Sequence, residues 1–97
     1  MILGGQILGT MWRKKMMKFS EIAGFLRKLG YNDKETTDHH IVFYEFNTMD
    51  FLMSEVAKKY DMDHNNGEVE EITMTQYWFG KTEFKKIKTL EELYDSV

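Results

Sequence analysis

A single apolar stripe near the start of the chain has the spacing of a helix. Within residues 21–29, apolar side chains fall at i, i+3, i+4 and i+7, so they share one helical face. They are Ile22, Phe25, Leu26 and Leu29. Ser20 precedes the stripe and has a side chain suited to an N-cap, and Gly30 follows it, as glycine often follows a helix. The pattern predicts a helix that ends at Gly30, followed by a polar connector, YNDKETTD, over 31–38.

The segment HHIVFYEF, residues 39–46, has the β-branched and aromatic composition of a strand. Alternate residues of a strand point to opposite faces, and here both faces are apolar. One face carries Ile41 and Phe43; the other carries Val42, Tyr44 and Phe46. A strand covered on both faces lies in the interior of its sheet or at a dimer contact.

Residues 47–60 return to a helical spacing. An N-cap at Asn47 or Thr48 would open this second helix, which runs through Tyr60. The residues that share its apolar face are Met49, Leu52, Met53, Val56 and Tyr60. The segment HNNG, residues 64–67, then breaks the pattern, and Asn66-Gly67 readily supplies a positive φ.

Residues 69–88 have the pattern of a β-hairpin. Two strand-like segments, VEEITMTQYWF at 69–79 and TEFKKIK at 82–88, flank the dipeptide Gly80-Lys81. Glycine in the first central position suits a type II′ turn, so Phe79 is expected to oppose Thr82, and Tyr77 to oppose Phe84. One face of this hairpin is the expected core face, with Ile72, Met74, Trp78 and Ile87; the other carries Tyr77, Phe79, Phe84, Lys86 and Lys88.

Thr89 and Glu92 have the spacing of a capping box, which predicts a final helix in LEELYDSV, residues 90–97. The predicted order is therefore α-β-α-β-β-α. It describes a small single α+β domain over residues 16–97, in which short helices pack on a three-stranded, mostly antiparallel sheet. Residues 1–15 are interpreted as an N-terminal extension, non-native or flexible, whose apolar stretch is too short for a membrane span.

Composition narrows the function classes. The 97 residues include no cysteine, which excludes disulfides, zinc–thiolate sites and a cysteine nucleophile. The net charge is −3, but it is uneven: residues 11–34 hold seven basic and two acidic side chains, and residues 35–76 hold two basic and ten acidic. Such asymmetry predicts two electrostatic faces. We expect a cytoplasmic protein, in the host cytoplasm if a phage encodes it.

The stretch YDMDHNNGE, residues 60–68, gathers oxygen and nitrogen ligands. A calcium loop started at Asp61 fails, because Gly67 comes one position late and Ile72 stands where the bidentate glutamate belongs. A transition-metal site would draw on Asp61, Asp63, His64 and His40. Histidines at the surface or at a cap are the alternative interpretation, so we predict no metal and no cofactor.

The second face of the hairpin is the predicted binding site. Its aromatic residues, Tyr77, Phe79 and Phe84, alternate with Lys86 and Lys88. Rings of this kind bind a protein partner when no helix covers them, and with neighbouring lysines they also suit single-stranded nucleic acid.

No nucleophile–base–acid set and no glycine-rich phosphate loop occur at any local spacing, so we predict that the protein is not an enzyme. The sequence favours a small protein-binding or accessory module, phage- or mobile-element-encoded, with an inhibitor of a host protein as one hypothesis. Its partner would be another protein or a second copy in a homodimer. The alternative is a module that binds single-stranded nucleic acid through the hairpin.

Overall fold

The computed structural model describes residues 16–45 and 56–97, so the predicted extension over 1–15 lies outside the described residues. The elements, in chain order, are β1 (Met17–Lys18), α2 (Phe19–Lys28), β2 (Asn32–Glu35), β3 (His40–Tyr44), β4 (Val56–Asp63), β5 (Glu68–Val69), β6 (Ile72–Trp78), β7 (Lys81–Ile87) and α4 (Leu90–Ser96). Within this part of the chain, no helix is long and apolar enough to cross a membrane.

Five antiparallel strands form the main sheet, in the order β2-β3-β4-β6-β7. Strands β1 and β5 pair separately as a two-stranded sheet. The predicted class, a small domain that mixes helices with antiparallel strands, is confirmed. The predicted three-stranded sheet is wrong, because β2 and β4 arise from segments that were expected to be a connector and a helix.

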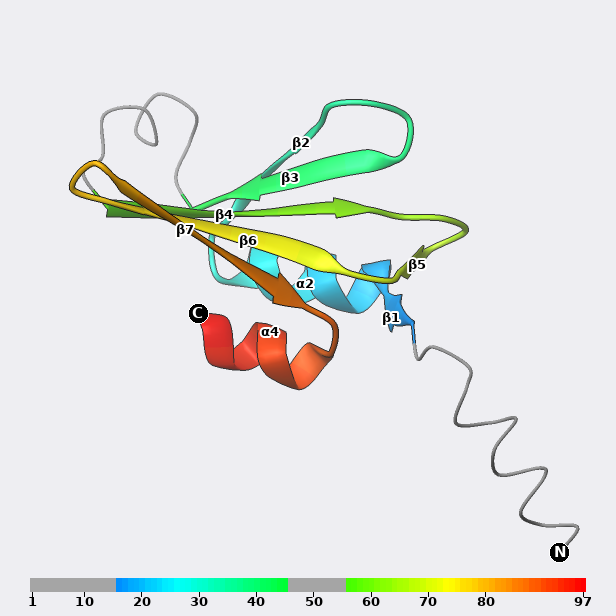
Figure 1. The fold of residues 1–97 in the computed structure, drawn as a ribbon. Coiled ribbons are helices and arrows are strands. Elements are labelled where there is room, and N and C mark those ends of the chain that lie inside the picture. The colour runs from blue at the N-terminus through cyan, green and yellow to red at the C-terminus, as the bar shows by residue number, and fades with distance from the viewer. Residues whose placement is uncertain (1–15, 46–55) are drawn as a thin grey trace, which may run out of the picture.

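The two helices of the described residues, α2 and α4, lie on the same side of the main sheet (Figure 1). The core fills the space between the helices and the sheet. Its largest fully buried side chains include Phe43, Tyr60, Ile72 and Leu93. The opposite side, which we call the open face, carries no helix among the described residues. By strand register it presents His40, Val42, Tyr44, Lys59, Asp61, Thr73, Thr75, Tyr77, Phe84 and Lys86.

The predicted first helix is confirmed as α2. It begins two residues earlier than expected, with Lys18 as N-cap, and Ser20 therefore makes no capping bond. At the other end Gly30 has φ +97, as predicted for a residue that stops a helix. The amide of Tyr31 donates to the carbonyl of Leu26, and that of Gly30 to the carbonyl of Arg27, which is the pairing of a Schellman ending.

The first predicted strand is also confirmed. As β3 it lies between β2 and β4, and it has buried residues on both faces: Ile41 and Phe43 toward the helices and Val42 on the open face. Its neighbour β2 has the sequence NDKE, with every residue exposed. An edge strand made only of polar residues has no hydrophobic alternation, and for that reason the sequence pattern predicts a connector there.

The predicted helix over 47–60 is wrong where the structure describes it. Residues 56–60 belong to β4, and residues 47–55 lie outside the described residues. Tyr60 and Met62 point to the core and are buried, while Lys59 and Asp61 alternate onto the open face. Tertiary pairing of β4 with β3 and β6 decides its conformation, because the apolar positions fit a strand as well as a helix.

Two local predictions near the ends of strands hold. Asn66 and Gly67 both have positive φ, +54 and +79, and turn the chain between β4 and β5. In α4 the Thr89 hydroxyl oxygen accepts from the Glu92 amide at 3.1 Å, and the Thr89 hydroxyl donates to the Glu92 carboxylate at 3.3 Å. These bonds satisfy polar groups that the first turn of a helix leaves without partners.

Candidate functional site

The β6–β7 hairpin carries the predicted binding residues, and its two faces separate as predicted. Ile72, Met74 and Ile87 are buried against the helices, although Trp78 on the same face is only half-buried. Tyr77, Phe84 and Lys86 lie on the open face. The division holds because residues that face each other across a ladder share a face.

The turn of the hairpin differs from the prediction by one residue. Trp78 pairs with Lys81, so the two central residues are Phe79 and Gly80 rather than Gly80 and Lys81. The predicted opposition of Tyr77 to Phe84 is therefore wrong; Tyr77 faces Thr82. Both central residues have positive φ, +44 at Phe79 and +83 at Gly80, which is the requirement of a type I′ turn.

Phe79 occupies a costly backbone conformation. A positive φ is rare for a bulky side chain, and type I′ turns favour asparagine, aspartate or glycine at this position. Holding an ordinary residue in a sparsely populated region costs about 1–3 kcal/mol. Burial of the Phe79 side chain offsets little of this backbone cost, because the side chain is 71% exposed.

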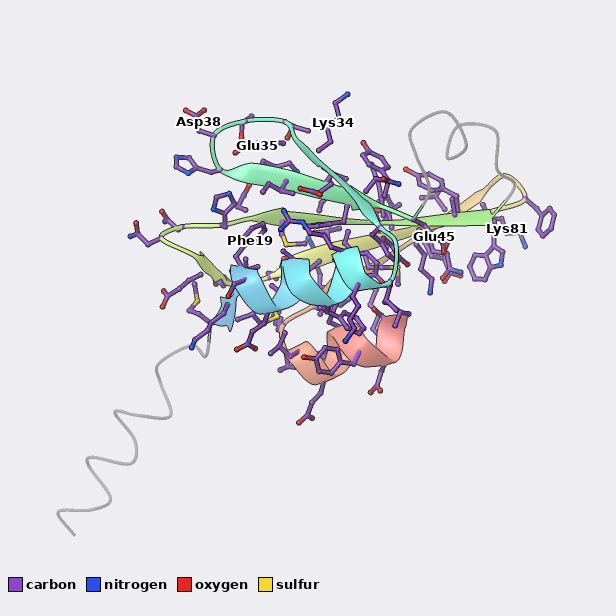
Figure 2. The ribbon with its side chains drawn as sticks, turned by 180° about the vertical axis from the view of Figure 1, so that it is seen from behind. Phe19, Lys34, Glu35, Asp38, Glu45 and Lys81 are labelled. Atoms are coloured by element: carbon purple, nitrogen blue, oxygen red, sulfur yellow. The ribbon has the colours of Figure 1, made fainter. Side chains whose placement is uncertain are left out.

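A second ring is equally uncovered. Phe84 is 70% exposed at the centre of β7, and Tyr77 beside the turn is half-buried. We call these three residues, Tyr77, Phe79 and Phe84, the ring end. Figure 2 labels the adjacent Lys81 at the tip of the hairpin, at the opposite end of the sheet from Asp38. The ring end thus spans both strands and the turn of the hairpin, with Phe79 at the tip and Phe84 further along β7.

The two predicted lysines do not join the ring end equally. Lys86 shares its face, but its ammonium group lies 3.2 Å from a Glu71 carboxylate oxygen and donates to the Thr73 hydroxyl at 2.9 Å. Lys88 follows the end of β7 and lines a separate cleft on the helix side, with Leu90 and Tyr94. The structure therefore brings Lys86, but not Lys88, to the same face as the rings.

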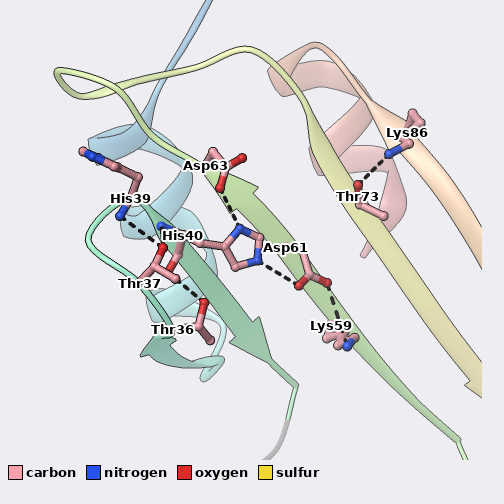
Figure 3. Close-up of polar contacts among 9 residues, drawn as sticks. All are labelled: Thr36, Thr37, His39, His40, Lys59, Asp61, Asp63, Thr73 and Lys86. Atoms are coloured by element: carbon pink, nitrogen blue, oxygen red, sulfur yellow. Dashed lines mark hydrogen bonds and ion pairs between the residues drawn. The ribbon is translucent and has the colours of Figure 1, made fainter.

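The suggested metal ligands divide between two places. His40, Asp61 and Asp63 meet on the open face, where the His40 ring lies between the two carboxylates (Figure 3). His64 is elsewhere: its ring stacks on Phe19 with centroids 4.7 Å apart. Among the residues that the structure describes, no group of three acidic or histidine side chains has the arrangement to hold a metal ion.

The His40 cluster is built for a charged imidazole. Nδ1 lies 2.7 Å from Asp63 and Nε2 lies 3.3 Å from Asp61. Only a protonated ring donates from both nitrogens, and such a ring has no lone pair for a metal. The hydrogen bond to Asp63 accordingly raises the pKa of His40, while partial burial opposes the rise. Lys59, 4.0 Å from Asp61, adds a further positive charge.

His40 should make the stability of the fold depend on pH. Because its pKa is raised in the folded state, its contribution is complete below the unfolded pKa of about 6.5 and is lost as pH rises through the folded pKa. We expect the difference in free energy of unfolding between wild type and His40→Gln to shrink as pH rises above about 6.5 and passes the raised pKa of His40. Urea denaturation measures it.

The control for that experiment is His39→Gln, since the His39 side chain is exposed and its ring lies 6.4 Å from that of His64, away from the two carboxylates. We call the protonated His40 ring held between Asp61 and Asp63 the His40 clamp. A difference between wild type and His40→Gln that does not change with pH contradicts this assignment. So does an equal pH dependence in His39→Gln.

The clamp was not predicted as such, although its signal is present. Asp61 and Asp63 are two positions apart, which places both on one face only if the segment is a strand. The predicted second helix ends at Tyr60 and no strand is predicted for Asp61 and Asp63, so the sequence interpretation does not place the two carboxylates on one face. His40 then pairs directly with Asp63 in the β3–β4 ladder, and Asp61 lies diagonally beside it.

Comparison with known proteins gives no relative. The chain matches no protein-family model, no curated protein and no solved structure. The function must therefore be argued from the site itself.

Proposed function

We propose that the protein is a small, non-enzymatic protein-binding module whose contact surface is the ring end of the β6–β7 hairpin. The observation that carries the proposal is Phe79, a bulky residue held at positive φ with 71% of its surface exposed. Backbone strain at an exposed position lowers the stability of the fold, and no burial of the side chain compensates for it. Residues of this kind concentrate at functional sites.

The second exposed ring extends the same surface. Covering a phenylalanine side chain contributes about 1.5–3 kcal/mol, and a few aromatic anchors commonly carry most of the energy of a protein interface. Phe84 is 70% exposed on the strand that leaves the turn, and Tyr77 lies on the strand that enters it. The three rings therefore offer a partner aromatic anchors on both strands and the turn of one hairpin.

Single-stranded nucleic acid, the alternative ligand class, draws less support from the geometry. Rings that stack on bases need lysines beside them to meet phosphates. On the open face Lys86 is engaged by Glu71, and Lys88 lies on the helix side. The lysines that remain near the ring end, Lys81 and Lys85, point to the other face of β7.

One substitution separates the fold from the proposed function. Asn-Gly is a favoured pair for a type I′ turn, so Phe79→Asn should raise the free energy of unfolding by about 1 kcal/mol. The same substitution removes an anchor and should weaken partner binding about tenfold or more. Urea denaturation measures the first effect. Retention of proteins from a cell lysate by the immobilised chain measures the second.

Two further variants make the retention experiment specific. Phe84→Ser should lose the same proteins as Phe79→Asn. Leu29→Asn, which changes a 51% exposed apolar residue at the end of α2, should keep them. If both ring variants retain the same proteins as wild type, or if Leu29→Asn loses them equally, the ring end is not the contact surface.

A further inference from the structure

Among the described residues, no strand pairs with the outer edge of β7. Strand β7 is the last strand in the order β2-β3-β4-β6-β7, and residues 81–86 are all exposed (Figure 1). In a two-residue hairpin the pair that flanks the turn, here Trp78 and Lys81, is a hydrogen-bonded pair. By alternation, the backbone amides of Thr82, Phe84 and Lys86 point away from β6. A row of outward N–H and C=O groups is a template for another strand.

The sequence of β7, KTEFKKI, complements its own reverse. In an antiparallel pair of two copies centred on Phe84, each Glu83 opposes the Lys85 of the other copy, and the two Phe84 rings oppose each other. Opposite charges and aromatic pairs stabilise such cross-strand positions. The outer pairs are Thr82 with Lys86 and Lys81 with Ile87, so all seven residues of β7 take part.

Neighbouring registers place like charges together. A two-fold axis through Glu83 sets Glu83 against Glu83 and Lys81 against Lys85. An axis through Lys85 or Lys86 sets lysine against lysine, and an axis through Thr82 leaves only residues 81–83 paired. Like charges directly opposite each other are destabilising. The register centred on Phe84 is therefore the one that the charges of β7 select.

The other edge of the sheet rejects such pairing. In β2, an axis through Asp33 sets that residue against itself, and an axis through Lys34 sets lysine against lysine and Asp33 against Glu35. Asp33 is also bound by Arg27, whose Nη2 lies 2.9 Å from its carboxylate. Lysines on an exposed edge ordinarily discourage an incoming strand. The lysines of β7 disfavour pairing with an incoming strand unless that strand places an acidic side chain, such as glutamate, opposite Lys85.

We propose that the partner of this edge is a second copy of the chain, which pairs with β7 antiparallel about Phe84 and joins two five-stranded sheets into one. The proposal rests on the proposed function, in that it assigns a partner to Phe84 of the ring end; Tyr77 and Phe79 lie outside the two β7 strands that pair. The contact is isologous, because the same residues serve on both sides of the two-fold axis. The helices of both copies then lie on one side of the joined sheet, and the two Phe84 rings meet on the open face.

Charge reversal tests the register. Glu83→Lys and Lys85→Glu each turn both cross-strand pairs into like-charge pairs, and should weaken dimerisation about tenfold. The double variant, Glu83→Lys with Lys85→Glu, restores opposite charges and should dimerise like wild type. An equimolar mixture of the two single variants should form a mixed dimer more tightly than either variant dimerises alone. Sedimentation velocity of the full chain measures each case, with circular dichroism to confirm folding.

A crosslink tests the two-fold axis. The chain has no cysteine, so a single introduced thiol reports its own neighbour. Across a hydrogen-bonded pair the Cα atoms are about 5.5 Å apart, within the range of a disulfide. Phe84→Cys should therefore oxidise to a covalent dimer. Thr82→Cys, on the same strand and face, should not, since its counterpart lies four residues away, about 13 Å.

Several results would overturn the proposal. They are a wild-type chain that sediments as a monomer at about 300 µM, a double variant as weak as the single ones, or equal crosslinking of both cysteine variants. Open polymers that grow with concentration would indicate β7 pairing with β2 instead. A monomer whose ring end still retains another protein would leave the proposed function in place and remove only the dimer.

Discussion

Phe43→Ala is expected to lower the free energy of unfolding by about 3–5 kcal/mol, a large share of the total stability of a small domain. Phe43 is fully buried in β3, between α2 and the neighbouring strands. Its ring lies 6.3 Å from that of Phe19, and the Arg27 guanidinium lies 5.9 Å from the ring centre. The substitution leaves a cavity at a site with packing on every side. Urea denaturation followed by tryptophan fluorescence measures the loss.

Phe84→Ala is the matched control, because the chemical change is identical and only the burial differs. With its ring 70% exposed, truncation of Phe84 should lower the free energy of unfolding of the monomer by less than about 0.5 kcal/mol, when both variants are measured at a concentration too low for the proposed dimer. Equal losses from the two substitutions would mean that the ring of Phe84 packs within the folded monomer, which would also remove the basis for the ring end as a binding surface.

Leu93→Ala should lower the free energy of unfolding by about 2–5 kcal/mol and release α4 in particular. Leu93 is fully buried where α4 packs on the sheet. Two contacts from β4 support the same helix: Lys58 donates to the Ser96 carbonyl at 2.6 Å, and the Tyr60 and Ser96 hydroxyls lie 2.8 Å apart. Hydrogen exchange should show faster exchange of the α4 amides than of the β3 amides in this variant.

Glu91→Ala is the control for this experiment, since Glu91 is an exposed residue of the same helix. It should change stability by less than about 0.5 kcal/mol. Uniform acceleration of exchange across the sheet and α4 in Leu93→Ala would show that the helix unfolds only together with the whole domain.

The parts of the fold that could be predicted are those in which local chemistry and tertiary packing agree. The stripe of α2, the glycine that ends it and the capping box at Thr89 and Glu92 act within one or two turns of chain, so the sequence alone specifies them. The interior position of β3 was also predictable. Residues buried on both faces have no polar alternation, and an edge strand could not carry them.

Two strands of the main sheet, β2 and β4, were not predicted, for opposite reasons. Strand β2 has no apolar residue at all, so nothing distinguishes it from a loop until β3 is present to pair with it. Strand β4 contains two overlapping hydrophobic periodicities. The spacing of Val56 and Tyr60 fits a helix, while that of Tyr60 and Met62 fits a strand. Pairing with β3 and β6 resolves the ambiguity, and pairing between distant segments is not visible in a local window.

The candidate site was predictable in composition but not in geometry. Alternation placed Tyr77, Phe84 and Lys86 on one face whichever way the hairpin turned. The position of the turn depends on whether Gly80 is the first or the second central residue. In the structure Gly80 is the second, so Phe79 is the first and must adopt a positive φ. A rule based on turn preference alone selects the unstrained alternative, and for that reason it missed the strain at the tip.

The strand order has a consequence for how the chain reaches this structure. Each strand of the main sheet pairs with a neighbour that is close along the chain, apart from the short excursion through β5. Such an arrangement needs only modest loop closures, and topologies dominated by near-sequence contacts fold faster than sandwiches of similar size. The two helices come from opposite ends of the described chain and meet the same side of the sheet. A sheet that assembles hairpin by hairpin would therefore expose its apolar side before α4, which follows every strand along the chain, packs on it.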